Sequence, residues 1–183
     1  MHFLQSLKNV IAEKFFFPGS RDDLSTRVSS RFADVYFNDQ TVIVAARHYV
    51  DRVLGGPGEP CTKYAISCSA QDLGASAMIA LSGSRHDLTE DELNDEVKKV
   101  FALAGVRSWN ALERKWWCIL IYEIPDDPEK RLKIVPTKKY STGGYLFVDE
   151  AATHVVSADA VSLGEVLRRL IDELDQSVVP ADD

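Results

Sequence analysis

Apolar and polar positions alternate over two short runs near the start of the chain's most regular part. Residues 32–37 and 41–46 are rich in β-branched and aromatic side chains, and an Asn-Asp pair at 38–39 separates them. This pattern predicts an antiparallel hairpin. Residues 63–68 predict a further strand. The glycines and prolines of residues 55–60 interrupt a ladder, so we expect an exposed loop there.

Helical periodicity follows each of three capping boxes, in which a hydroxyl and a carboxylate three residues apart satisfy the first free N–H groups of a helix. The boxes are Ser69 with Asp72, Thr89 with Glu92, and Ser162 with Glu165. The three predicted helices end near Gly83, Gly105 and Leu174. Ser108 is expected to begin a shorter helix.

The second half of the chain repeats this plan. Strands are predicted over residues 117–124, 132–135, 143–148 and 153–157. Each half places a Leu-Gly pair near the start of its helix: Leu73-Gly74 and Leu163-Gly164. This weak internal repeat predicts an α+β fold with two similar halves. Each half would have an antiparallel sheet segment followed by a packed helix.

The domain organisation follows from where these patterns begin and end. Apolar residues at helical spacing predict an N-terminal helix over 1–19, and a Ser- and Arg-rich stretch predicts a linker over 20–31. One α+β domain is expected over 32–176, with halves at about 32–105 and 106–176, followed by a frayed tail at 177–183. Charged residues interrupt the N-terminal apolar pattern, so neither an export signal nor a membrane anchor is predicted.

Composition and charge narrow the function classes. The 183 residues carry 21 Lys and Arg against 28 Asp and Glu, a net charge of -7. This acidity disfavours binding to a phosphate backbone and fits a basic partner. Three cysteines without a CxxC pair, Cys61, Cys68 and Cys118, encode neither a disulfide framework nor a zinc ribbon, so we expect a reducing cytoplasm.

Motifs for catalysis are missing from the sequence. The four histidines are scattered without metal-ligand spacing, no serine stands in a GxSxG elbow, and Thr142-Gly143-Gly144 does not open a helix as a phosphate loop would; the histidines are His2, His48, His86 and His154. We therefore expect no enzyme, no metal, no cofactor and no small-molecule ligand. An enzyme with a site around His48 or His86 remains a third possibility.

Two basic clusters beside aromatic residues suggest an alternative function. The runs are Arg114-Lys115-Trp116-Trp117 and Lys138-Lys139-Tyr140. Cations interleaved with aromatic rings are typical of proteins that bind single-stranded nucleic acid. The competing interpretation is that an indole belongs to the core and the cations to an exposed helix end. The net negative charge favours the second interpretation.

A dense acidic run is the strongest candidate for binding. Its carboxylates exceed what helix capping and the helix dipole require, and Glu92 is reserved for capping. They are either a solvated helix face or a surface that steers a positively charged partner. The candidate binding residues are Asp87, Glu90, Asp91, Asp95 and Glu96.

The order of elements and several short motifs resemble the contact-dependent growth inhibition immunity (CdiI) proteins, in the branch once catalogued only as a domain of unknown function. The similarity covers residues 32–174. It rests on Val35-Tyr36-Phe37-Asn38 leading into Val42-Ile43-Val44-Ala45, Lys133-Ile134-Val135-Pro136, Gly143-Gly144 before an aromatic residue, and the closing Ser162-Leu163-Gly164-Glu165 helix.

This resemblance implies a cytoplasmic protein that binds the C-terminal toxin domain of a CdiA effector and blocks its active site. Such toxins are often nucleases with basic clefts, which agrees with the acidity of this chain. An inhibitor of this kind needs a preorganised interface and no catalytic residue. A fold-level analogy supports function by association only.

Overall fold

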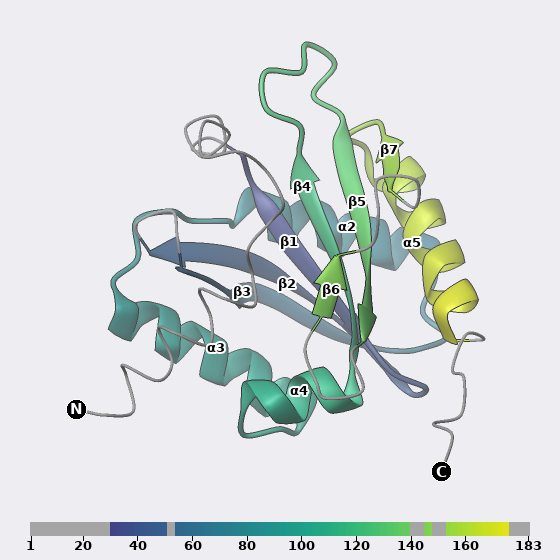
Figure 1. Cartoon of the computed structure of the whole chain (residues 1–183). Coiled ribbons are helices and arrows are strands. Elements are labelled where there is room, and N and C mark those ends of the chain that lie inside the picture. The colour runs from purple at the N-terminus through teal and green to yellow at the C-terminus, as the bar shows by residue number, and fades with distance from the viewer. Residues whose placement is uncertain (1–29, 51–53, 140–144, 148–152, 176–183) are drawn as a thin grey trace.

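The computed structural model describes residues 30–50, 54–139, 145–147 and 153–175. The predicted helix over 1–19, almost all of the linker over 20–31 and the tail over 177–183 lie outside these residues. Figure 1 shows a twisted sheet with helices packed around it. Within the described ranges, no helix has the length and apolar character that a membrane span requires.

The described strands form one antiparallel sheet of seven strands in the order β3-β2-β1-β4-β5-β6, with β7 also paired to β5. The α+β class is confirmed. The first three strands extend outward on one side of the sheet centre and the later strands on the other. Their bounds are β1 (Phe32–Phe37), β2 (Thr41–Val50), β3 (Leu54–Ala65), β4 (Trp117–Glu123), β5 (Leu132–Lys139), β6 (Tyr145–Phe147) and β7 (His154–Val156).

The predicted hairpin is confirmed as β1 and β2. Asn38 closes the turn, because its side-chain Oδ1 accepts the N–H groups of Gln40 and Thr41 at 3.0 and 2.9 Å. Its own N–H donates to the Thr41 carbonyl at 3.0 Å. β2 runs on to Val50, beyond the predicted end, so its last residues extend past the start of β1.

The expectation of an exposed loop over residues 55–60 is wrong, because that stretch belongs to β3 at the edge of the sheet. An edge strand tolerates proline since only one of its sides must pair. The glycines allow close packing: a Cβ on Gly55 would lie 2.7 Å from Tyr49 Cε1, and one on Gly56 would lie 2.8 Å from Val97 Cγ2. A bulge opposite Ala45 and Ala46 interrupts the pairing.

Four described helices pack on the sheet: α2 (Ala70–Ser82), α3 (Glu90–Ala104), α4 (Trp109–Lys115) and α5 (Ala160–Asp175). The capping boxes at Ser69 and Thr89 are confirmed. The predicted box of Ser162 with Glu165 is wrong, because α5 starts earlier. Asp159 Oδ1 accepts the Ser162 N–H at 2.8 Å, so this carboxylate caps the helix and Ser162 lies within its first turn.

Strand alternation divides the apolar residues between two cores. Ala33, Val35 and Phe37 of β1 face α2 and α5, which contribute Leu73 and Leu163. On the opposite face a second core packs against α3 and α4; its buried members are Tyr36, Ile43, Ala45, Val100, Val106, Leu112, Trp116 and Cys118. Each face of the sheet therefore carries a packed apolar core.

Candidate interaction surface

The predicted acidic residues gather at the start of α3, but they are not equivalent. Asp87 precedes the helix, Asp91 and Asp95 are exposed on it, and Glu90 is half-buried. We call Asp87, Glu90, Asp91 and Asp95 the acidic face. The Lys98 ammonium donates to Asp95 Oδ1 at 2.7 Å, and this hydrogen bond lowers the pKa of Asp95. Part of the acidic charge is thus offset within the helix.

Glu96 has a different environment and fastens α3 to β3. Its carboxylate accepts the backbone N–H of Glu59 and the ammonium of Lys99, each at 2.8 Å, and its side chain is 19% exposed. Burial raises the pKa of Glu96, but the Glu59 N–H and the Lys99 charge outweigh that effect and leave the pKa lowered. Of the five predicted residues, Glu96 contributes least to an open charged surface.

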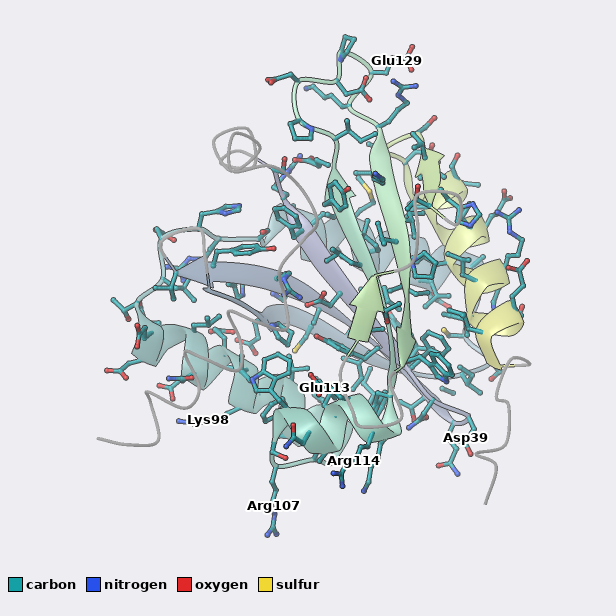
Figure 2. All side chains as sticks on the ribbon, in the orientation of Figure 1. Asp39, Lys98, Arg107, Glu113, Arg114 and Glu129 are labelled. Carbon is teal, nitrogen blue, oxygen red and sulfur yellow. The ribbon has the colours of Figure 1, made fainter. Side chains whose placement is uncertain are left out.

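Basic side chains follow the acidic face toward the other end of this layer. Figure 2 shows Lys98, Arg107 and Arg114 directed away from the sheet, whereas Glu113 of α4 points toward it. Lys98, Arg107 and Arg114 are exposed, while Glu113 is buried. Lys98 pairs with Asp95, so the outer surface of this layer has the acidic face near the start of α3 and the basic residues Arg107 and Arg114 beyond its end.

Beneath α3 and α4, the sheet holds a buried ion pair that the sequence did not reveal. Arg47 Nη1 donates to both carboxylate oxygens of Asp34, at 3.0 and 3.1 Å, and the side chains are 6% and 0% exposed. The Tyr36 hydroxyl donates to the same carboxylate at 3.3 Å. Burial raises the pKa of Asp34 and the Arg47 guanidinium opposes that rise. Enclosed in this way, the pair orders the core and cannot touch a substrate.

The histidines weighed as catalytic candidates have structural surroundings. His48 is 1% exposed, and its Nδ1 accepts the Arg85 N–H at 3.2 Å. The His86 ring stacks on Tyr49 with a centroid separation of 5.3 Å and an interplanar angle of 4°. In the part of the chain that the structure describes, no His, Cys, Asp and Glu side chains group as a metal site would require.

The cysteines are not activated as nucleophiles. Burial raises the pKa of the Cys61, Cys68 and Cys118 thiols, most strongly for Cys118, which is fully enclosed. A reactive cysteine needs a lowered pKa and an electropositive, accessible setting. These thiols behave as small apolar groups instead.

The basic-aromatic run at residues 114–117 does not form a stacking surface. Trp116 is 3% exposed and belongs to the core beneath α3 and α4. Trp117 faces the other core, where its ring stacks on that of Phe37 with a centroid separation of 6.5 Å. The two indoles are thus packed on opposite faces of the sheet. In the second cluster, Lys138 and Lys139 belong to β5, and Tyr140, like Thr142-Gly143-Gly144, lies outside the described residues.

Comparison with known proteins supports the fold. No family model matches the chain, and no curated protein matches its sequence. A solved protein of unknown function, NMB0488 from Neisseria meningitidis, is similar with a TM-score of 0.60 at 16% identity, covering 79% of this chain and 95% of that one. A chain of the CdiA-CT/CdiI toxin and immunity complex from Yersinia pseudotuberculosis is similar with a TM-score of 0.55 at 18% identity, covering 77% and 95%. The arrangement of strands and helices is thus one that also occurs in a toxin and immunity complex.

Proposed function

We propose that this protein is an immunity protein that binds and neutralises the C-terminal toxin domain of a CdiA effector, a nuclease, in the cytoplasm of the cell that makes it. The observation that carries the proposal is the fold shared with a chain of a toxin and immunity complex over most of both chains. The net charge of -7 supports it, because a nuclease presents a basic cleft to its substrate.

The acidic face is the proposed contact with the toxin. Asp91 and Asp95 are exposed on α3, and Asp87 lies just before it. α3 is held firmly, by the Thr89 cap at its start and by Glu96 on β3. A surface that is ordered before binding loses little conformational entropy when a partner docks, which favours tight inhibition without catalysis. Glu96 acts in this proposal by holding the helix in place.

Co-expression tests the proposal directly. The probe is the C-terminal domain of a large exoprotein encoded beside this chain, produced under an inducible promoter in a sensitive bacterial host. We expect co-production of this protein to restore growth, and the purified pair to form a stable complex that blocks cleavage of nucleic acid by the toxin. Continued growth arrest together with failure of the two folded proteins to associate would refute the proposal.

A further inference from the structure

The loop between α2 and α3 is fastened to the protruding end of β2 by a small set of contacts. Tyr49 N–H donates to the Arg85 carbonyl at 2.8 Å, and the Ser84 hydroxyl donates to the Arg47 carbonyl at 2.7 Å. The Leu88 N–H also donates to the Tyr49 carbonyl at 3.4 Å, and the Arg85 N–H donates to Nδ1 of His48 at 3.2 Å. The pairing of β1 with β2 ends at Arg47. Beyond that point, the loop forms hydrogen bonds with the side of β2 on which β1 had paired.

The His48 contact requires a neutral imidazole. Nδ1 accepts a hydrogen bond only while its lone pair is free, and a proton there would set one N–H against the N–H of Arg85. His48 is 1% exposed, so no bulk water can take over the broken bond. Protonation would therefore push the loop away from the end of β2.

Charged groups from several elements face this imidazole. Burial is the main cause that lowers the pKa of His48, and the charge of Arg85 in the loop lowers it further. Glu96 of α3 and Asp34 of β1 raise it, as does the hydrogen bond with the backbone of Glu59 in β3. Lys99 and Arg47 offset these two carboxylates through the ion pairs described above. The net result is a pKa below the ordinary value of 6.5, so the ring is neutral at neutral pH.

Close packing against β3 and α3 restricts rotation of the ring. A Cβ on Gly58 would lie 2.5 Å from His48 Cδ2 and 2.7 Å from Glu96 Cβ, so strand, ring and helix are in close contact. A protonated ring held this tightly cannot relieve its repulsion from Arg85 by rotating. Separation of the loop from the end of β2 is then the movement that relieves the repulsion.

We propose that His48 is a pH-sensitive latch that holds the α2–α3 loop against β2 when neutral and releases it when protonated. The loop leads directly into Asp87 and the start of α3, so its release would loosen the acidic face. The consequence for toxin binding rests on the proposed function, whereas the latch itself belongs to the free protein.

Amide hydrogen exchange in the free, full-length protein tests the latch. The reporting amides are those of Arg85 and Tyr49, and amides of α2 serve as an internal control. After division by the intrinsic rates, the open population should stay constant above pH 6.5. It should then rise by up to about tenfold per pH unit as the pH falls from 6.5 to the lowered pKa of the latched ring, because opening is linked to the uptake of one proton, and it should level off below that pKa. A pH-independent open population in the natural chain would overturn the proposal.

Two matched variants identify the titrating group. His48→Gln keeps a donor and an acceptor but cannot titrate, so the pH-dependent rise should vanish; its persistence would overturn the proposal. Glu96→Gln removes a charge that favours protonation of the latched ring, so the rise should continue to a lower pH than in Asp95→Asn, which makes the same charge change at an exposed position. If His48→Gln fails to fold, a rise that levels off at the same pH in these two variants overturns the proposal by itself. A working latch in a protein that binds no toxin would refute the proposed function alone.

Discussion

Gly74 of α2 and Gly164 of α5 face one another where the two helices cross, and each lies against the backbone of the other helix. A Cβ on Gly74 would lie 1.8 Å from the Ala160 carbonyl oxygen, and a Cβ on Gly164 would lie 2.0 Å from the Ala70 carbonyl oxygen. The contact is reciprocal, because each glycine meets the residue four positions before the other. The Leu-Gly pair that recurs in the sequence therefore marks one shared helix crossing.

Replacing either glycine should force the helices apart. We expect Gly74→Ala to lower the free energy of unfolding by about 1–3 kcal/mol, as overpacking of a close contact does. Gly164→Ala should have a similar effect, and the double variant should cost less than the sum, since one separation accommodates both methyl groups. Urea unfolding measures all three. Gly105→Ala serves as the contrast. An added Cβ there would meet no atom within 4 Å, so its cost comes only from placing alanine in a left-handed backbone conformation, with a φ of 67°. Strictly additive losses at the crossing would contradict the shared contact.

Most elements of the fold follow from local signals in the sequence. The hairpin turn at Asn38 and the capping boxes at Ser69 and Thr89 act through hydrogen bonds between residues two to four positions apart, so the sequence displays both partners. The strand predicted over residues 63–68 overlaps the end of β3 at residues 63–65, but the first part of β3 was missed because its stability is not local. Glycines and prolines of low strand propensity are held there by β2 on one side and by α3 above.

Removing one member of the buried ion pair should lower the free energy of unfolding. Arg47→Met leaves the Asp34 carboxylate without its cation in the core, so we expect a loss of about 3–5 kcal/mol in the free energy of unfolding. Replacing both residues, as Asp34→Leu with Arg47→Met, should cost clearly less than the sum of the single changes. Denaturant unfolding of the set forms a double-mutant cycle. A coupling energy near zero would show that the two side chains do not depend on each other.

The cap of α3 should contribute in a pH-dependent manner. Thr89→Ala removes the hydroxyl that accepts the Glu92 N–H, and we expect it to cost about 1 kcal/mol at neutral pH. The pKa of Glu92 is lowered because the N–H and hydroxyl of Thr89 donate to its carboxylate. Its contribution is therefore complete above the ordinary pKa of 4.5 and is lost as the pH falls through the lowered value. Thermal unfolding of the natural chain and of Thr89→Ala between pH 7 and pH 3 should show the difference in stability becoming smaller in acid. A difference that stays constant with pH would contradict this.

Charge reversal on the acidic face should slow association with the toxin. At low salt, Asp91→Lys and Asp95→Lys should each reduce the association rate constant by about tenfold and flatten its salt dependence, while dissociation changes little. Stopped-flow mixing at two salt concentrations measures this. Glu173→Lys makes the same change in net charge on α5, against the other face of the sheet, and serves as the control. Equal effects of all three variants would assign the steering to net charge and not to the acidic face.

Single-stranded nucleic acid should not bind in a saturable manner at near-physiological salt. The indole of Trp116 is buried beneath α3 and α4, so no ring of that residue is offered to a base. Trp116→Ala should instead destabilise the fold by about 3–5 kcal/mol. Fluorescence anisotropy with labelled DNA and RNA checks the first expectation and urea unfolding the second. Tight binding that Lys115→Glu abolishes without loss of fold would support the alternative function.

The candidate surface was only partly predictable, because some of its contacts join residues that are far apart in the sequence. Spacing along one helix shows that Asp91 and Asp95 share a face, which the structure displays. It cannot show that Glu96 turns inward, because the group that holds it, the Glu59 N–H, lies 37 residues earlier in the chain. The pairing of Asp34 with Arg47 was hidden in the same way, since each charged residue stands within an apolar strand and its partner lies across the ladder.

The misassigned stretch of β3 has a consequence for the protein in a crowded solution. Among the described strands, β3 pairs only with β2, so its other side is an edge of the described sheet. An open edge is a template on which a second chain can add a strand and begin to aggregate. Pro57 and Pro60 have no backbone N–H to offer such a strand, and the bulge at Glu59 and Pro60 disturbs the register that it would need. The same residues that resemble a loop in the sequence leave this edge poorly suited to self-association.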